Sequence, residues 1–275
     1  MHARLRRLTA LRYVQPLREG GSLPAVVDTD DGFYVVKFRG AGQGARALIA
    51  ELIVGSLALE LGLPVPDLAL IDVRDEFGRS EPNPEIQDLL RASHGINVGL
   101  RYLDGAFNFA LAAAGDLVSD DFASRVVWLD AFVTNPDRTH RNTNLLIHER
   151  KPYLIDHGAA LYAHHDWAAV DDARTRTPFP LIRDHVLITR ATEIENADAD
   201  FGSRIDADLI RRVLDLVPDE LLEHAGGFDT PDAARERYAR YLLERVRPPR
   251  AFVVEARHAR TAIHAAPPRR LHERR

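Results

Sequence analysis

The chain has 275 residues, of which 45% are hydrophobic and 28% charged, a balance typical of a globular protein with a sizeable core. It contains no cysteine, which excludes disulfides, thiolate metal sites and cysteine nucleophiles. Its net charge of -5 gives no indication of a nucleic-acid partner.

The N-terminal part of the chain is predicted to be rich in strands and to contain one long helix. Apolar and β-branched runs predict strands at 12–17, 25–28, 33–38, 68–73 and 97–103. An Asp-Gly pair between two of these runs, in TDDG at 29–32, is a hairpin signal. A helix is expected over 45–61, because this apolar segment lacks proline and is followed by Gly62, a common helix stop.

The C-terminal part is predicted to be mainly helical. Helical patterns lie at 120–132, 206–216, 218–225 and 231–247, and a shorter one lies earlier, at 84–91. Ser119 is the candidate N-cap of the first of these helices. Short apolar runs at 145–147 and 153–155 flank a polar turn and predict a small hairpin. We therefore predict an α+β protein, with a strand-rich lobe at 1–103 and a helical lobe at 104–275.

A polar loop after the predicted helix at 120–132 contains the strongest chemical signal. Asp137 and Asn142 lie five residues apart on this loop, and Asp156 follows fourteen residues later in LIDHG. Phosphoryl transfer needs oxygen ligands for Mg²⁺ and a carboxylate that orients the attacking hydroxyl. Asn142 and Asp156 suit the first role and Asp137 the second. Asp, Asn and Gly are common in any loop, so neither the Asp137–Asn142 spacing nor LIDHG is specific by itself. The prediction depends on the order and spacing of the two segments.

Lys37 and Lys151 are the only lysines, whereas arginine supplies nearly all other positive charge. Lys37 ends the run FYVVKF, and Glu51 lies in the next predicted helix between apolar residues. A buried carboxylate should be paired, and Lys37 is the obvious partner. Kinases hold ATP phosphates with a strand lysine that is oriented by a glutamate of the following helix. The alternative is an edge-strand lysine, which the scarcity of lysine elsewhere makes less attractive.

A glycine-rich turn near the N-terminus is a weaker signal for the same chemistry. Gly20, Gly21 and Ser22 could cover phosphates with their backbone N–H groups. A plain hairpin turn is an equally good interpretation of this segment.

Five segments, read in order, resemble the HipA-like kinase family, which is grouped with the phosphatidylinositol kinases in the protein-kinase-like superfamily. They are PLREGGSLP, YVVKF, AELIVGSLALELGLPVP, NPDRTHRN and LIDHG, and the resemblance covers residues 11–161. It implies a bilobal protein-kinase-like fold, with ATP and Mg²⁺ as cofactors.

The resemblance also implies a role for each matching residue. Lys37 corresponds to the phosphate-binding lysine and Glu51 to the helix glutamate. Asp137 corresponds to the catalytic aspartate, and Asn142 and Asp156 to the magnesium ligands. The nucleotide would further contact the Gly20, Gly21 and Ser22 turn and the backbone of Leu100, Arg101, Tyr102 and Leu103.

Two departures from the family pattern concern the acceptor. HipA itself has a longer N-terminal region, and Thr139 stands where the family typically has histidine. Arg138 directly follows Asp137, as in the loop of type II phosphatidylinositol 4-kinases. The first expectation is an ATP- and magnesium-dependent kinase that acts on a protein hydroxyl. The alternatives are a phosphatidylinositol or small-molecule kinase, and a nucleotide-binding pseudokinase or toxin–antitoxin interaction module.

The expected partners are therefore ATP and a protein or small-molecule acceptor of unknown identity. No apolar run reaches the roughly 18 residues of a membrane span. The basic N-terminal segment lacks the long apolar stretch of a signal peptide, so we expect a cytoplasmic location. His164, His165 and Asp166 are a weaker metal candidate without a further ligand at suitable spacing, and we predict an exposed loop there.

Overall fold

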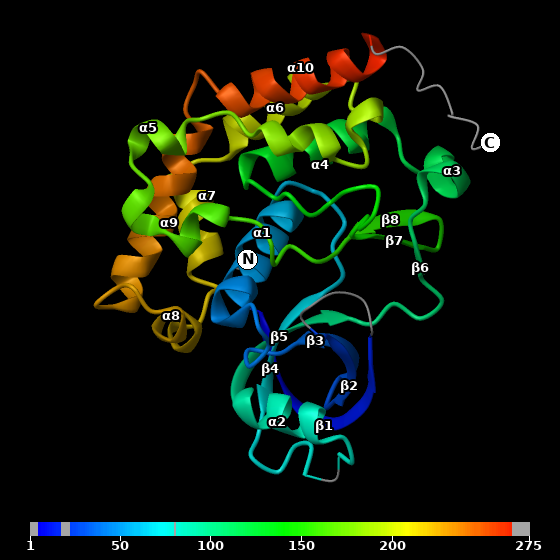
Figure 1. Ribbon diagram of the computed structural model, residues 1–275, viewed down its shortest axis with the longest axis vertical. Helices are drawn as coiled ribbons and strands as arrows, with labels where there is room; N and C mark the ends of the chain where they lie inside the picture. Colours follow the sequence, from blue (N-terminus) through cyan, green and yellow to red (C-terminus); the bar gives the residue numbers. More distant parts are fainter. Residues whose placement is uncertain (1–4, 18–22, 80, 266–275) are drawn as a thin grey trace, which may run out of the picture.

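The computed structural model describes residues 5–17, 23–79 and 81–265. Figure 1 shows a ring of strands at one end of the molecule and a group of helices at the other. The chain is thus a mixed α/β protein with a strand-rich N-terminal region and a helical C-terminal part, as predicted. The Gly20, Gly21 and Ser22 turn lies outside the described residues.

Five strands of the N-terminal region close into a barrel, in the order β1-β2-β3-β5-β4. They are β1 (Arg6–Pro16), β2 (Ala25–Thr29), β3 (Gly32–Lys37), β4 (Leu68–Val73) and β5 (Gly95–Arg101). The tight turn at Asp30 and Asp31 joins β2 to β3, which confirms the predicted hairpin. β1 starts earlier than predicted, because its first half pairs in parallel with β4 and closes the barrel.

Alternation along the strands separates two faces of the barrel wall. Tyr34 and Val36 of β3 are fully buried in the barrel interior, together with Val27 of β2 and Ile71 of β4. α2 (Pro84–Ala92) adds Leu90 to the same interior cluster. Because successive side chains of a strand point to opposite faces, residues next to Tyr34 and Val36 face outward from this cluster.

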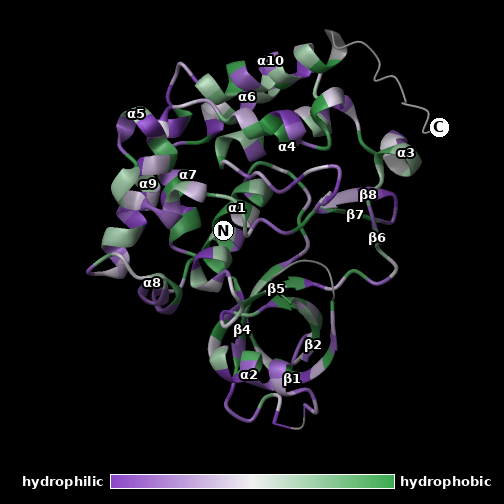
Figure 2. Ribbon diagram, viewed as in Figure 1, coloured by the Kyte–Doolittle hydropathy of each residue, from purple (hydrophilic) through white to green (hydrophobic). Residues whose placement is uncertain are grey.

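α1 (Gly44–Glu60) lies between β3 and β4 in sequence but packs among the helices (Figure 1). Figure 2 shows that hydrophobic residues make up much of this helix. A helix that is apolar on every side has to be buried. α1 meets that need by packing against α7 (Ala207–Leu214) and α8 (Asp219–Ala225).

The remaining α-helices lie in the C-terminal part. They are α3 (Leu111–Ala114), α4 (Asp120–Phe132), α5 (Asp172–Thr175), α6 (Ile194–Arg204), α9 (Pro231–Val246) and α10 (Ala251–Ala265). α4 has the predicted bounds, and its predicted N-cap Ser119 accepts a hydrogen bond from the Phe122 N–H at 3.0 Å. Trp128 and Phe132 of α4 contact Phe252 of α10, and Trp128 also contacts Phe201 of α6.

A small antiparallel sheet lies beside these helices, in the order β6-β7-β8. Its strands are β6 (Phe107–Asn108), β7 (Leu145–His148) and β8 (Lys151–Leu154). β7 and β8 form the hairpin predicted within the helical part. No helix among the described residues is long and apolar enough to cross a membrane.

Candidate active site

Lys37 lies on the outer face of the barrel wall, where β3 meets α1. Its neighbour Val36 points into the barrel, so strand alternation turns the Lys37 side chain the other way. α1 places Glu51 opposite, and the Lys37 Nζ donates to Glu51 Oε2 at 2.6 Å. Glu51 is fully buried and the Lys37 side chain is 10% exposed.

The same ammonium group also contacts a residue far along the chain. Lys37 Nζ donates to Asp156 Oδ1 at 2.5 Å, across 119 residues of sequence. Burial alone would lower the pKa of Lys37, but the two carboxylates outweigh it and raise that pKa above its usual value. Burial would likewise raise the pKa of Asp156, and the Lys37 charge holds it below its usual value. Both groups are therefore charged at neutral pH.

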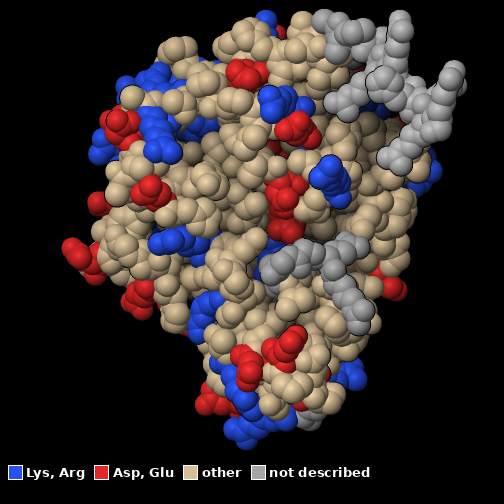
Figure 3. Space-filling view, in the orientation of Figure 1, with Lys and Arg blue, Asp and Glu red and all other residues tan. Residues whose placement is uncertain are grey.

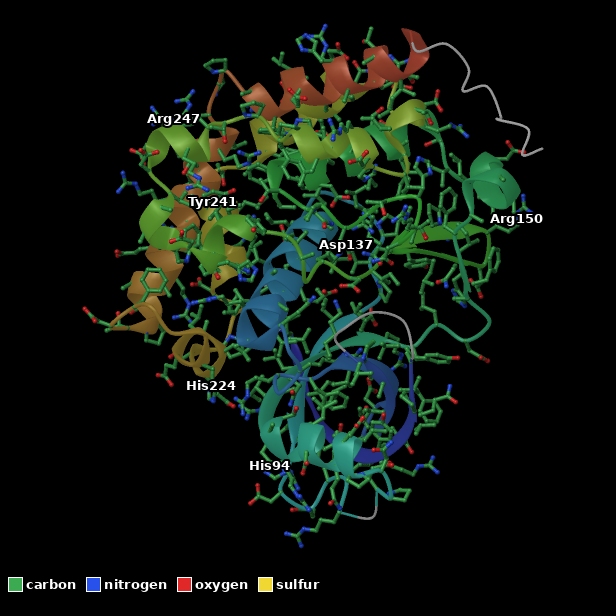
Figure 4. The ribbon with its side chains drawn as sticks, in the orientation of Figure 1. His94, Asp137, Arg150, His224, Tyr241 and Arg247 are labelled. Atoms are coloured by element: carbon green, nitrogen blue, oxygen red, sulfur yellow. The ribbon has the colours of Figure 1, made fainter. Side chains whose placement is uncertain are left out.

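Asp137 lies on the loop after α4 and is held by two amide side chains. Its Oδ2 accepts from Asn142 Nδ2 at 2.7 Å and from Asn144 Nδ2 at 3.1 Å. Figure 4 labels Asp137 between the helices and the barrel, and Figure 3 shows acidic side chains gathered in the same area of this face. The second carboxylate oxygen is thereby left to meet an incoming donor.

A family model describes the same part of the chain. The model of the HipA-like kinases matches residues 13–175, which is more than half of the sequence. The chain belongs to the HipA-like kinase family. This finding confirms the resemblance drawn from the sequence motifs and supports a kinase-type function.

Solved structures include a similar fold. The crystal structure of the proinflammatory kinase CtkA of Helicobacter pylori matches with a TM-score of 0.55. The match covers 94% of this chain and 98% of that one, at 12% sequence identity. At this identity the likeness concerns the fold. No curated protein sequence matches the chain.

In this HipA-like kinase, Asn142 and Asp156 are the predicted magnesium ligands, and each keeps an oxygen atom that could hold the ion. Asn142 uses its Nδ2 to bind Asp137, which leaves its amide oxygen for a metal ion. The Asp156 side chain is 34% exposed and so stays accessible beside Lys37. The described residues contain no group of three or more His, Cys, Asp or Glu arranged to hold a metal. Mg²⁺ commonly takes one or two protein ligands and leaves the rest to substrate and water.

The loop after α4, which bears Asp137, is anchored on a buried carboxylate that the sequence motifs did not reveal. Asp130 of α4 is fully buried and accepts from Asn135 Nδ2 at 3.0 Å, Arg138 Nε at 2.6 Å and His185 Nε2 at 2.9 Å. Burial would raise the pKa of Asp130, but Arg138 and His185 lower it below its usual value. The signal was present in the sequence, because a carboxylate inside the apolar run VVWLDAFV needs partners just as Glu51 does.

Arg138 extends this anchor toward Asp156. The side chain is almost fully buried, and its Nη1 donates to the carbonyl oxygens of Asn144 and Ile155. Its Nη2 lies 3.3 Å from Nδ1 of His157, whose pKa burial lowers to about 4. Arg138 is thus part of the loop's support and does not face the acceptor side of Asp137.

The residues predicted to contact adenine lie at the end of β5, next to the strand that bears Lys37. The Arg101 N–H donates to the Asp67 carbonyl at 2.8 Å and the Tyr102 N–H to the Phe33 carbonyl at 2.9 Å. Leu100 pairs with β3 and β4 inside the barrel sheet. The Leu103 carbonyl accepts from the Ala106 N–H at 3.2 Å, so each of the four residues uses part of its backbone within the fold.

The prediction of an exposed loop at His164 is wrong. His164 is 1% exposed, and its Nδ1 lies 3.1 Å from the Tyr238 hydroxyl on α9. Packing of this segment against α9 buries the ring, while the adjacent His165 stays exposed. His164 is therefore a buried residue of the core. Its hydrogen bond is to α9 and not to Lys37 or Asp137.

Proposed function

We propose that this protein is an ATP- and magnesium-dependent phosphotransferase with a bilobal protein-kinase-like fold, in which 1–103 form the N-lobe and 104–275 the C-lobe. The main support is the contact of one lysine, Lys37, with Glu51 and Asp156, which places strand, helix and distant loop at one point. A buried Lys–Glu pair beside a loop aspartate is the arrangement that kinases use on ATP phosphates.

Each residue has a role in this proposal. Lys37 binds the α- and β-phosphates, and Glu51 holds its ammonium group in place. Asn142 and Asp156 hold Mg²⁺, which neutralises charge on the phosphates when bound. The segment Leu100–Leu103 offers its remaining backbone groups to the adenine, and the Gly20, Gly21 and Ser22 turn covers the phosphates.

Asp137 is proposed to act on the acceptor. A hydroxyl oxygen of the acceptor forms a bond to the γ-phosphorus, while the bond from that phosphorus to the β,γ-bridging oxygen breaks. The hydroxyl proton passes to the free carboxylate oxygen of Asp137, and ADP leaves with the bond electrons. Asn142 and Asn144 keep the carboxylate aimed during this transfer.

The acceptor is proposed to be a serine or threonine hydroxyl of a protein, as the family resemblance implies. The Asp137-Arg138 pair suggested a lipid-kinase loop at the level of sequence. In the structure Arg138 is buried against Asp130. This residue pair therefore has a structural explanation and does not favour a lipid acceptor.

Two variants test the proposal by separating binding from chemistry. Asp137→Ala should leave the affinity for Mg·ATP nearly unchanged and lower phosphate transfer by a factor on the order of 10²–10⁴, the usual contribution of a positioned base. Asp156→Ala should weaken nucleotide binding in the presence of Mg²⁺, because a charged ligand is lost.

Calorimetry with Mg·ATP and transfer of labelled phosphate into lysate proteins would measure the two effects. The roles are misassigned if Asp137→Ala abolishes binding while Asp156→Ala leaves binding and transfer unchanged. Absence of any nucleotide binding by the wild-type protein would contradict the proposed function as a whole.

A further inference from the structure

His157, the residue after Asp156, contacts two buried ionic clusters. Its ring Nδ1 is 3.3 Å from Nη2 of Arg138, which is bound to Asp130. Its backbone N–H donates to Glu51 Oε2 at 2.8 Å, the same oxygen that accepts from Lys37. The His157 side chain is fully buried. One residue therefore connects the support of the loop after α4 with the Lys37–Glu51 pair.

The contact with Arg138 defines what the His157 ring does. A guanidinium group only donates hydrogen bonds, so Nδ1 must be the acceptor and the ring proton must lie on Nε2. Nε2 is buried and has no hydrogen-bond partner among the described residues. The Nδ1 lone pair is thus the polar feature through which this ring is held.

Asp156 needs support on both sides because of its backbone conformation. Its φ is 55°, in the left-handed region that residues other than glycine rarely adopt. Such a conformation is strained and persists only when the surroundings hold it. On one side the Ile155 N–H donates to the Asn144 carbonyl at 3.1 Å. On the other side His157 is held through both its backbone and its ring.

We propose that His157 is a positioning residue whose Nδ1, held by Arg138, keeps the Asp156 carboxylate aimed at Lys37 and at the metal site. This inference rests on the proposed function, because it gives Asp156 a metal to bind. The ring does not touch nucleotide or acceptor and acts through the conformation of the preceding residue. Partners that orient metal ligands in this way typically contribute about 10- to 100-fold in metal affinity.

Two substitutions separate the acceptor atom from the bulk of the ring. His157→Phe fills a similar volume but removes the acceptor, so Arg138 Nη2 loses its partner. His157→Asn is smaller, but its amide oxygen occupies nearly the position of Nδ1 and accepts the same hydrogen bond. Under the proposal the smaller residue preserves the site better than the larger one, whereas a simple packing role predicts the reverse order.

His164 offers a matched control on the same segment. It is also a buried histidine whose Nδ1 is hydrogen-bonded and whose Nε2 has no partner within the described part of the chain. Its partner is Tyr238 of α9, which is no part of the Arg138 and Glu51 contacts of His157. His164→Phe should destabilise the fold without changing nucleotide binding that depends on Mg²⁺.

The first experiment measures binding of a non-hydrolysable ATP analogue by calorimetry, with Mg²⁺ and with EDTA. His157→Phe should weaken the Mg²⁺-dependent binding by about 10- to 100-fold and leave the binding in EDTA unchanged. His157→Asn and His164→Phe should stay close to the wild type. If both His157 variants bind the magnesium complex like the wild type, or if Asn weakens it more than Phe, the inference is wrong.

The second experiment needs no ligand and distinguishes this inference from the proposed function. Hydrogen exchange of the backbone amides at 155–158 should be faster in His157→Phe than in the wild type or His157→Asn. Equal exchange rates in all three proteins would overturn the positioning role of His157, regardless of the result of the nucleotide-binding experiment. Faster exchange only in His157→Phe, with no nucleotide binding by the wild type, would keep the support of Asp156 and reject the metal role proposed for it.

Discussion

At the scale of single residues, Lys37 is confined between Glu51 and Asp156 with 10% of its side chain exposed. A planar guanidinium is bulkier than an ammonium group and cannot place one point charge between both carboxylates and the phosphates. We expect Lys37→Arg to lower the turnover number on the order of 10²-fold, the usual effect of losing one preorganised donor to the reacting group. Steady-state kinetics of labelled phosphate transfer would measure it.

Lys151 is the matched control for this substitution, because it is the other lysine of the chain and is exposed on β8. Lys151→Arg should leave turnover unchanged. Turnover of Lys37→Arg equal to that of Lys151→Arg would remove Lys37 from the mechanism.

His164 makes the stability of the fold depend on pH. Burial, together with the charges of His165 and Arg46, lowers its pKa to about 3, from an ordinary value near 6.5. Below about pH 6.5, His164 therefore binds a proton in the unfolded chain but not in the folded chain. The free energy of unfolding falls as the pH drops below this value. Between pH 6.5 and pH 5 this one group should remove about 2 kcal/mol from the free energy of unfolding.

Urea unfolding at both pH values would measure the effect. In His164→Phe the change in the free energy of unfolding between the two pH values should be smaller by that amount. The buried residues His157 and His185, whose pKa values are also lowered by burial, should still contribute in this variant. An unchanged pH dependence in His164→Phe would show that His164 is not the titrating group.

At the scale of elements, the C-terminal end of α4 is held by a buried arginine from α9. Arg245 donates to the carbonyl oxygens of Phe132 at 2.6 Å and Ala131 at 2.8 Å, and to that of Thr175 at 2.8 Å. A cation at this end of a helix is favourable, because the last carbonyls of a helix have no partner within it. This contact fixes the point at which the loop of Asp137 begins.

Arg245→Met should lower the free energy of unfolding by about 3 kcal/mol, because buried carbonyl groups lose their donor. Arg247→Met is the control, since that side chain is 67% exposed and should change stability by less than about 0.5 kcal/mol. Denaturant unfolding of both variants gives the comparison. Equal stability of the two would mean that Arg245 does not support α4.

At the scale of the whole molecule, Glu220 of α8 ties the barrel to the helical part. Its Oε1 accepts from Arg39 Nη1 at 2.6 Å and from the backbone N–H of Ile96 at 3.0 Å. Arg39 follows β3 and Ile96 lies on β5, so both barrel contacts converge on one carboxylate. α8, which bears Glu220, also packs against α1.

Glu220→Ala should speed hydrogen exchange of the Ile96 amide by about fivefold, which corresponds to the loss of one hydrogen bond worth about 1 kcal/mol. Exchange measured residue by residue would test this. Glu223→Ala, on the exposed side of the same helix, should leave Ile96 unchanged. Unchanged exchange in Glu220→Ala would show that the carboxylate does not protect β5.

Local sequence patterns predicted most elements, because helix and strand periodicity and turn residues act over a few positions. The bounds of β4 and α4 agree with the prediction. α6 was missed because IENADADFGSR is mostly polar, and its helical state depends on the burial of Phe201 against α4. This helix could therefore be recognised only from the tertiary structure, which shows the elements that it packs against.

Residue type, spacing and family resemblance predict the candidate site residues without knowledge of their distances. These residues are Lys37, Glu51, Asp137, Asn142 and Asp156. The tertiary structure alone decided that Lys37 and Asp156 touch across 119 residues and that Arg138 belongs to a buried network. It also decided that α1 packs with the helices that follow the barrel and that His164 is buried. The physical reason is that such contacts depend on how whole elements pack, whereas the sequence pattern of each element specifies only its own periodicity and buried face.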